Sequence, residues 1–278
     1  MAILQATVQS VSLGRTVPIQ VILPVDKVLG GGSSGKREYP TLYLLHGLLG
    51  SSTDWITNTN IVKYAMERDL AVVMPSGDNS FYVEQGVPNN DYGAYIGQEL
   101  VALTRRMFPL SAQRDRTFLA GLSMGGFGAL RNGFKYAETF GYIAGFSSAL
   151  NMFELPFDAP NRCIMHEDAV FGDLEAAAKT DKNPRVAFEN MKRRMKEAPG
   201  FTMPKIYMAV GTEDRLLEPN RTFRDFLLRG GAELTYREEP GAHTWEFWGM
   251  QIRDVMDWLP LGSTSAGLNS GNVFAPTR

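Results

Sequence analysis

Short continuous runs of apolar residues recur along this chain, and stretches with helical spacing separate them. A strand that is buried on both faces of a parallel sheet has this unbroken apolar character. Five such runs are PTLYLLHG, DLAVVMPSG, RTFLAGLSMGG, YIAGFSSAL and PKIYMAVGTED, and a sixth, AELTYREEPG, is more polar and is expected nearer a sheet edge. Strands that alternate with helices predict right-handed crossovers and a mostly parallel central sheet with helices on both faces.

The order of the expected elements narrows the fold class further. Residues 3–13 and 17–25 alternate apolar and polar side chains, as paired strands at a sheet edge do. Helical spacing is found in five stretches: 61–68, 94–108, 125–136, 219–229 and 246–259. Two antiparallel strands followed by strand–helix units is the order of an α/β-hydrolase, and the sequence therefore predicts that fold.

The length of 278 residues allows one large domain with a well-buried core, predicted over residues 1–260. Residues 151–200 interrupt the alternation with prolines, acidic clusters and the helical stretch MKRRMKEA. We interpret them as a small cap or insertion over the carboxyl edge of the sheet, either a surface excursion or a partial lid. The segment 261–278 is rich in Gly, Ser and Asn and is expected to be a flexible tail.

Composition excludes several classes of function. Lys plus Arg number 28 and Asp plus Glu number 30, so no basic surplus exists for binding a nucleic-acid backbone. No apolar stretch approaches the roughly 20 residues of a membrane span, so no membrane partner is expected. The N-terminal segment is typical of a strand rather than a signal peptide, and the single cysteine, Cys163, allows no intrachain disulfide. Both observations favour the cytoplasm, and the sequence leaves a homo-oligomer open.

A GxSxG motif, Gly121-Leu122-Ser123-Met124-Gly125, stands between a buried strand and a helix. A serine on such a tight, strained turn projects its hydroxyl above the sheet. The N–H of Met124 and the positive end of the following helix then face a reacting carbonyl oxygen. Ser123 is therefore the predicted nucleophile, and the alternative is a glycine-rich turn whose serine only caps the helix.

A serine nucleophile needs a base, and the chain contains three histidines. His243 follows the last predicted strand and precedes the last helix, which is where this fold carries its catalytic histidine. His166 lies in the irregular insertion and is typical of a solvated loop, and His46 belongs to another motif. His243 is therefore the predicted base.

The carboxylate partner of His243 is expected at the end of the strand that precedes the histidine loop. The segment VGTED supplies Asp214 there, with Glu213 beside it. Asp214 is preferred because it opens the following helix as a turn residue, although a helix cap alone would also place an aspartate there. Asp173 and Asp181, in the insertion, are weaker candidates. The role of such a carboxylate is to hold the imidazole tautomer and to stabilise the imidazolium.

A second loop, His46-Gly47-Leu48-Leu49-Gly50, follows the first continuous apolar run. An HGxxG loop at that place supplies one amide of an oxyanion hole, expected to be the N–H of Leu48, beside that of Met124. His46 itself is expected to brace the loop rather than to act as a base.

Residues 30–36 read GGGSSGK and imitate a phosphate-binding loop. Arg37 stands where the Mg²⁺-binding hydroxyl would be, and Pro40 prevents a helix from starting there. The stretch is interpreted as a flexible connection. His, Cys and carboxylate residues show no metal-ligand spacing, so no metal and no other cofactor is expected.

Taken together, YLLHGLLGSSTDW, FLAGLSMGGFGAL, VGTEDRLLE and PGAHTWEFW resemble the esterase D and tributyrin esterase group of α/β-hydrolases over roughly residues 3–260. That group also contains S-formylglutathione hydrolases and is related to feruloyl and acetylxylan esterases. The resemblance implies the roles already given for Ser123, Asp214 and His243. Trp55 matches a tryptophan of the family, and with His46 and Gly47 it is expected at the substrate-binding site.

The resulting hypothesis is a serine carboxylesterase that hydrolyses small short-chain esters through an acyl-enzyme. The family's thioesterases usually carry a cysteine after the HG loop, where this chain has Ser51 and Ser52, so an S-formylglutathione-like thioesterase is a second choice. The sequence also leaves open a feruloyl or acetylxylan type of carbohydrate esterase and, more remotely, a non-catalytic binding protein on the same fold. Loops 76–92 and 151–200 are expected to bound a shallow cleft that favours short acyl chains.

Overall fold

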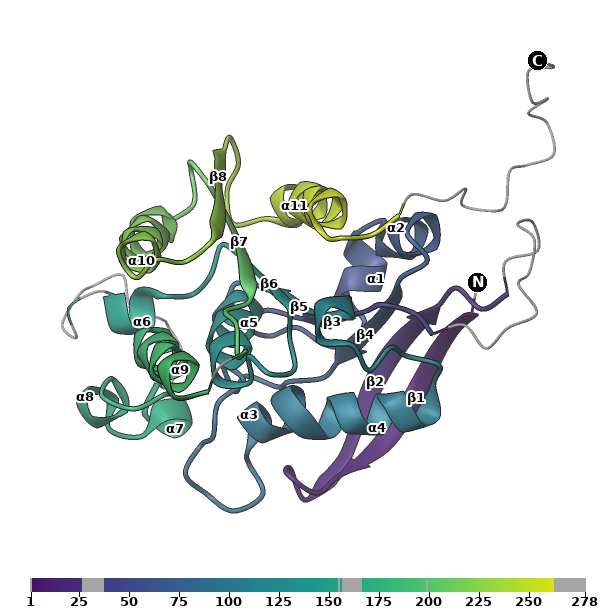
Figure 1. Ribbon diagram of the computed structural model, residues 1–278, viewed down its shortest axis with the longest axis horizontal. Coiled ribbons are helices and arrows are strands. Elements are labelled where there is room, and N and C mark those ends of the chain that lie inside the picture. Colours follow the sequence, from purple (N-terminus) through teal and green to yellow (C-terminus); the bar gives the residue numbers. More distant parts are fainter. Residues whose placement is uncertain (1, 27–37, 155, 157–166, 199, 263–278) are drawn as a thin grey trace.

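The computed structural model describes residues 2–26, 38–154, 156, 167–198 and 200–262. Within these residues eight strands form one sheet in the order β1-β2-β4-β3-β5-β6-β7-β8 (Figure 1). The strands are β1 (Ala2–Ser10), β2 (Arg15–Leu23), β3 (Thr41–Leu45), β4 (Ala71–Pro75), β5 (Thr117–Leu122), β6 (Tyr142–Phe146), β7 (Lys205–Gly211) and β8 (Leu234–Glu239).

Strand pairing follows the sequence pattern closely. β1 and β2 form an antiparallel hairpin with Ala2 opposite Leu23, and β2 pairs antiparallel with β4. Every later pair, from β4–β3 to β7–β8, is parallel. β8, the strand with the most polar sequence, forms the far edge of the sheet. The predicted α/β-hydrolase fold is confirmed.

Two apolar cores lie on the two faces of the sheet, because successive side chains of a strand point in opposite directions. Leu42 and Leu44 of β3 belong to the core beneath α1 (Asp54–Asn58), α2 (Ile61–Glu67) and α11 (Trp245–Trp258). Tyr43 and Leu45 of the same strand belong to the other core. That face is covered by α4 (Leu100–Met107), α5 (Met124–Lys135), α9 (Pro184–Glu197) and α10 (Leu217–Arg229) (Figure 1).

The stretch 94–108, expected to be one regular helix, is divided into three parts. A short helix α3 (Tyr92–Ala94) leads into a π-helical segment, Tyr95–Glu99, which continues as α4. The ring of Tyr136 packs over Gly97 in this widened turn, at a place where a Cβ atom would lie 2.0 Å from the ring. The side chain of Glu99 reaches back to the β1–β2 turn and accepts hydrogen bonds from the N–H groups of Val11 and Ser12.

The insertion at 151–200 differs from the expectation in its second half. α9 does not lie over the carboxyl edge of the sheet but packs along α5, where the rings of Phe188 and Phe134 are 5.2 Å apart. Arg194 donates hydrogen bonds to the carbonyl oxygens of Phe134 and Lys135 at the end of α5. The physical reason is an apolar stripe of Ala187, Phe188 and Met191, which makes α9 the crossover helix from β6 to β7.

The first half of the insertion holds three short helices, α6 (Asn151–Glu154), α7 (Glu167–Phe171) and α8 (Leu174–Ala177). Phe171 of α7 packs against Phe127, in the first turn of α5, and against Phe81. Residues 157–166, which include His166 and Cys163, lie outside the described part of the chain. So do residues 27–37, which contain the expected flexible connection at 30–36, and residues 263–278 of the expected tail 261–278. A cap formed by the rest of 151–200 stays a prediction.

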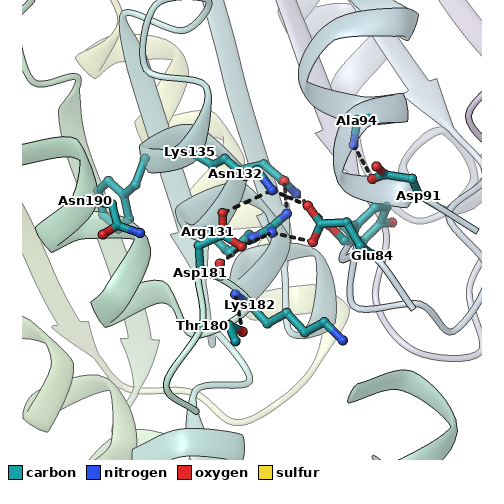
Figure 2. Close-up of polar contacts among 12 residues, drawn as sticks. Glu84, Asp91, Ala94, Arg131, Asn132, Lys135, Thr180, Asp181, Lys182 and Asn190 are labelled. Atoms are coloured by element: carbon teal, nitrogen blue, oxygen red, sulfur yellow. Dashed lines mark hydrogen bonds and ion pairs between the residues drawn. The ribbon is translucent and has the colours of Figure 1, made fainter. Parts of the chain in front are cut away.

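A buried arginine on α5 joins this insertion to the loop after β4. The side chain of Arg131 is wholly buried and lies between Glu84 of that loop and Asp181, which precedes α9 (Figure 2). It donates hydrogen bonds to Glu84 Oε2 at 2.5 Å and to Asp181 Oδ1 at 3.0 Å, and Lys135 also pairs with both carboxylates. Burial alone would raise the pKa of the Glu84 carboxyl, but the charges of Arg131 and Lys135 outweigh it and lower that pKa to about 2.

Glu84→Gln is expected to lower the free energy of unfolding by about 3 kcal/mol at neutral pH, the value of a shift from 4.5 to about 2. Because the folded-state pKa is depressed, this contribution is complete above about pH 4.5 and is lost as the pH falls towards 2. Urea unfolding of both proteins at neutral pH and near pH 3 would measure the shrinking difference. Glu138→Gln, which removes the exposed partner of Arg194, is the control and should cost less than about 1 kcal/mol. Equal losses of unfolding free energy in the two variants at neutral pH would contradict the stabilising role assigned to the Glu84 carboxylate.

Candidate active site

Ser123 occupies the sharp turn between β5 and α5, with φ 53° and ψ −117°. Non-glycine residues rarely adopt such a positive φ, and they do so where the surrounding structure holds them. Here the Ser123 N–H donates to the carbonyl of Phe146 at 2.8 Å, and the Ser123 carbonyl accepts from the N–H groups of Phe127 and Ala149 at 3.0 Å. The backbone of Ser123 is therefore fixed on both sides.

Two glycines allow this turn to be tight. A Cβ atom on Gly121 would lie 2.4 Å from the backbone of Gly125. A Cβ atom on Gly125 would lie 2.6 Å from the carbonyl oxygens of Leu45 and His46. The start of α5 thus rests directly on the end of β3 and on the loop that follows it, an approach that no larger residue permits.

Three loops at the carboxyl edge bring Ser123, His243 and Asp214 together. His243, between β8 and α11, has its Nε2 atom 3.0 Å from Ser123 Oγ. Its Nδ1 atom is 2.9 Å from Oδ2 of Asp214, which follows β7. When Nδ1 carries the proton, Nε2 has a free lone pair directed at the serine hydroxyl. Such an arrangement can remove a proton from Ser123 and stabilise the imidazolium that forms.

The side chain of Asp214 is wholly buried, and its Oδ1 atom also accepts the N–H of Leu216 at 2.9 Å. Burial would raise the pKa of this carboxyl, but the hydrogen bond and charge of His243, with further donors, hold that pKa below its ordinary value. Asp214 is therefore an anion beside the imidazole at neutral pH.

The other carboxylates that the sequence offered lie elsewhere. The side chain of Glu213 is exposed and accepts the N–H of Gly241. Asp173 accepts the N–H of Ala176 at the start of α8, and Asp181 pairs with Arg131. Of these candidates the structure brings only Asp214 to His243.

The HGxxG loop lies next to the serine. A Cβ atom on Gly47 would be 3.5 Å from Cβ of Ser123. Within the described residues the N–H groups of Leu48 and Met124 make no hydrogen bond to protein, whereas Leu49 N–H donates to Asn79 Oδ1 at 2.8 Å. Two unpaired amides beside a serine hydroxyl can stabilise an oxyanion.

His46 and Trp55 lie beneath this loop, and the structure corrects the expectation that they contact substrate. Each is 1% exposed. His46 Nε2 accepts the N–H of Gly77 at 2.9 Å, so Nδ1 carries the proton and donates to the carbonyl of Gly47 at 2.7 Å. Burial lowers the pKa of His46 and keeps this ring neutral. The Trp55 indole donates to the carbonyl of Leu45 at 3.0 Å.

A cavity of about 690 Å³ opens above these groups. Ser123 and His243 line its floor, and Trp245 and Trp248 supply apolar surface. Polar side chains complete the lining: Asp54, Asn58, Arg215, Thr244 and Glu246. Gly47 lines the cavity, as expected, with Leu48, Leu49, Gly50 and Leu122.

The loops expected to shape this cavity do not line it in the described part of the chain. No described residue of 76–92 or 151–200 is among its lining residues. Phe81 and Tyr82, two large aromatic residues of the loop 76–92, are 1% and 0% exposed and belong to the core. The walls come instead from the HGxxG loop with α1 and from the start of α11.

Comparison with known proteins identifies the family. The family described as "Putative esterase" matches residues 10–259. The chain belongs to this esterase family. It is a carboxylesterase, so the alternative of a non-catalytic binding protein is set aside.

Individual relatives agree with the family. The chain is 38% identical over 266 residues to an acetyl esterase of Caldicellulosiruptor saccharolyticus, a match that covers 93% of this chain and 98% of the relative. A fluorophosphonate-binding serine hydrolase of Staphylococcus aureus superposes with a TM-score of 0.80 and is 27% identical. An S-formylglutathione hydrolase of the same organism superposes with a TM-score of 0.78 and is 28% identical. Both superpositions cover 93% of this chain and 98% of the other.

Sequence reasoning missed several residues around the esterase site. Asn79 holds the amide of Leu49, and no motif in the sequence marks it. Trp248 lines the cavity and packs edge-on against His243, with ring centroids 4.9 Å apart. Its place one turn into the helix after the histidine could have indicated it. Within the described residues no group of three or more His, Cys, Asp or Glu side chains could hold a metal ion. No helix among them is long and apolar enough to cross a membrane.

Gly125→Ala is expected to reduce kcat/KM by at least about 100-fold, because the new Cβ would push the serine turn away from β3 by a fraction of an ångström or more. It should also lower the free energy of unfolding by about 1–3 kcal/mol through overpacking. Ester turnover and urea unfolding measure the two effects. Gly249→Ala, within α11, is the control, since the nearest atom to its new Cβ would be Cγ2 of Thr59 at 4.0 Å. It should be neutral or stabilising by up to about 1 kcal/mol. A fully active Gly125→Ala enzyme would contradict the close approach.

Proposed function

We propose that this carboxylesterase hydrolyses short-chain acyl esters, acetyl esters foremost, with Ser123 as nucleophile, His243 as general base and Asp214 as its anionic partner. The observation that carries the proposal is the unbroken path of two hydrogen bonds, 3.0 Å and 2.9 Å long, from the Ser123 hydroxyl through His243 to Asp214. It ends on the floor of the cavity, where an ester can reach it.

Acylation begins when His243 Nε2 takes the proton of Ser123 Oγ as that oxygen attacks the ester carbonyl carbon. The carbonyl oxygen becomes an oxyanion, and the amides of Leu48 and Met124 donate hydrogen bonds to it. The bond from carbon to the leaving oxygen then breaks, and the alcohol departs with the proton from His243. Asp214, ionised because its pKa is lowered, stabilises the imidazolium throughout this step.

Deacylation repeats the sequence with water. His243 Nε2 takes a proton from a water molecule, whose oxygen attacks the acyl carbon of the Ser123 ester. The same two amides hold the second oxyanion. The proton returns to Ser123 Oγ as the carboxylic acid leaves, so the enzyme is restored with this chain's residues and water alone.

The cavity supports a short acyl chain. Its lining mixes two tryptophans and three leucines with the charged groups of Asp54, Arg215 and Glu246, and it opens to solvent. A long alkyl chain would gain about 0.8 kcal/mol for each CH₂ only where it leaves water, and the charged rim offers little such surface. The name of the 38% identical relative, an acetyl esterase, agrees with this interpretation.

An acetylated carbohydrate is a second candidate substrate, favoured by the shape of the same lining. Trp245 is half-buried at the cavity, and the planar groups of Asp54, Asn58 and Arg215 line the same cavity. A flat aromatic face with planar hydrogen-bonding groups suits the ring and hydroxyls of a sugar on the leaving side. The thioesterase alternative draws support from the S-formylglutathione hydrolase relative, and an acetyl thioester belongs in any substrate panel.

Asp214→Asn should leave the fold intact and reduce kcat by on the order of 10³-fold or more, because an amide can favour the wrong histidine tautomer. Ser123→Ala should abolish turnover of p-nitrophenyl acetate and labelling by a fluorophosphonate. Glu213→Gln is the matched neighbour and should keep nearly full activity, since its amide oxygen can still accept the N–H of Gly241. An inactive Glu213→Gln enzyme together with an active Asp214→Asn enzyme would refute the role of Asp214. A fluorophosphonate label mapped to Ser147 or Ser148 would refute the role of Ser123.

The acyl preference is tested with p-nitrophenyl esters of increasing chain length. We expect the highest kcat/KM for acetyl to butyryl esters, weak activity beyond about eight carbons, and no activation at an oil–water interface. A rate that climbs steadily with chain length would show that an apolar tunnel receives the acyl group. The same panel includes acetylated sugars and ethyl acetate. A comparison of their kcat/KM values decides whether the part of the site that binds the leaving alcohol recognises carbohydrate.

A further inference from the structure

The HGxxG loop contains a tight turn with a strained leucine in it. The N–H of Gly50 donates to the carbonyl of Gly47 at 3.2 Å, which closes a four-residue turn. Leu49 has a φ of 61°, whereas Leu48 is not among the described residues with a positive φ. These are the features of a type II β-turn, whose third position ordinarily carries Gly or Asn. A leucine in that conformation persists only where the surrounding contacts hold it.

The side chain of Asn79 supplies such a contact. Its Oδ1 atom accepts the N–H of Leu49 at 2.8 Å. A backbone N–H can only donate, so the amide oxygen of the asparagine, and not its nitrogen, must face it. The type I and type II forms of a turn differ in the orientation of the central peptide, which here joins Leu48 to Leu49. Asn79 therefore holds that peptide in the type II orientation, against the conformational preference of leucine.

The loop after β4 presents Asn79 from a fixed backbone. Ser80 Oγ donates to the carbonyl of Gly77 at 2.6 Å and accepts the N–H of Tyr82 at 3.1 Å. The N–H of Gly77 donates to Nε2 of His46 at 2.9 Å, and the Tyr82 hydroxyl donates to the carbonyl of His46 at 3.1 Å. Asn79 thus lies between two residues that are bonded to each other, in a loop tied to the residue just before the turn.

The peptide that precedes Leu48 carries the amide predicted for the oxyanion hole. Its carbonyl oxygen, that of Gly47, accepts from Nδ1 of His46 at 2.7 Å and from the N–H of Gly50. Because the C=O and N–H of a trans peptide point in opposite directions, these two bonds direct the N–H of Leu48 away from them. That N–H has no hydrogen-bond partner within the described residues. Leu48 is therefore held through one peptide by His46 and through the other by Asn79.

We propose that Asn79 is a positioning residue of the esterase, which keeps the turn at 47–50 in its type II form and so holds the N–H of Leu48 in place for the oxyanion. Without Asn79 the central peptide rotates to relieve the φ of Leu49, and the peptides on either side move with it. A displacement of about 1 Å in a reacting site can reduce the rate by about 100-fold. The inference rests on the proposed function, in which the N–H of Leu48 binds the oxyanion.

Leu49 offers a matched pair of backgrounds for the test. Its side chain is 80% exposed, so neither Leu49→Ala nor Leu49→Gly opens a cavity in the core. Both changes remove the leucine side chain from the cavity wall, but only glycine adopts a positive φ without strain. The type II form needs no support from Asn79 in the Leu49→Gly background and still needs it in the Leu49→Ala background. The difference between the two backgrounds therefore reports on conformational support and not on the lost side chain.

The experiment measures the effect of Asn79→Ala on turnover of p-nitrophenyl acetate in three backgrounds. In the parent and in Leu49→Ala, Asn79→Ala should lower kcat by roughly 10- to 100-fold with little change in KM. The upper figure corresponds to the loss of a whole oxyanion-hole donor, about 100-fold or more. In the Leu49→Gly background the same change should lower kcat by less than about threefold.

Asn190→Ala is the control for the substitution itself. Asn190, on α9, is partly buried like Asn79, and its Oδ1 atom also accepts a hydrogen bond, from Arg193 at 3.0 Å. Its removal should leave kcat within about twofold of the parent. If thermal melting shows that Asn79→Ala is not folded, Asn79→Leu, which keeps a side chain of similar size without an acceptor, is measured in the same three backgrounds.

Inhibition by a short-chain trifluoromethyl ketone gives a second readout. Ser123 Oγ adds to the ketone carbon while its proton passes to His243, and the adduct carries an oxyanion. The inhibition constant should rise in Asn79→Ala by about the same factor as kcat/KM falls, because both depend on stabilisation of that oxyanion. A general loss of stability would lower the melting temperature without this agreement.

Equal effects of Asn79→Ala in the Leu49→Ala and Leu49→Gly backgrounds, a loss confined to KM, or an unchanged inhibition constant would overturn the inference. Its failure is distinguishable from failure of the proposed function. Turnover that survives in Ser123→Ala would refute the function itself, whereas an inactive Ser123→Ala together with a fully active Asn79→Ala would refute only the positioning role.

Discussion

The contact between the first turn of α5 and the end of β3 is the constraint on which the rest of the site depends. Backbone atoms meet there with no side chain between them, because Gly121 and Gly125 have no Cβ. The approach forces Ser123 into a positive φ and lifts its hydroxyl towards the loop that carries His243. It also places the N–H of Met124, which has no hydrogen-bond partner in the described part of the chain, beside the HGxxG loop. One packing contact therefore arranges both the predicted nucleophile and the predicted oxyanion-hole amides.

Strain is concentrated at the same edge of the sheet. Among the described residues eight non-glycine positions have a positive φ, and six of them follow β3, β4, β5 or β6 at their carboxyl ends: Leu49, Asp78, Phe81, Tyr82, Ser123 and Ser147. Each is a small conformational cost that the cores beneath must offset. Tyr82 shows how this is done, because its ring fills the space beside Gly77 and Gly128 and its hydroxyl donates to the carbonyl of His46. The rigid core thus fixes the loops that carry the chemistry.

The sequence could predict the elements whose cause is local. Unbroken apolar runs predicted β3 to β7, and the GxSxG motif predicted the turn that carries Ser123. A strand followed by a tight turn and a helix leaves the serine few other positions. The order of serine, acid and histidine along the chain predicted that Asp214 and His243 would lie at the same edge of the sheet as Ser123. The sequence failed where a role depends on contacts between distant segments. No residue next to Trp55 in the sequence indicates that its indole donates to the carbonyl of Leu45 instead of contacting substrate. No motif near Asn79 indicates its hydrogen bond to the N–H of Leu49.

Two buried ionic groups of the esterase, Arg131 and Asp214, show why such contacts matter for function as well as stability. Arg131 is surrounded by two carboxylates, an amide and a backbone carbonyl, so its charge is neutralised and it joins three segments without chemical reactivity. Asp214 is buried as fully, but its nearest partner is the imidazole of His243 and not a permanent cation. In the proposed mechanism His243 becomes an imidazolium beside this carboxylate when it accepts the proton of Ser123. In that mechanism the attraction between carboxylate and imidazolium strengthens as the reaction proceeds, which lowers the barrier rather than only binding the ground state. A permanent cation such as Arg131 beside Asp214 would also stabilise the carboxylate but would remove this difference, and the protein instead places the imidazole of His243 and the N–H of Leu216 there.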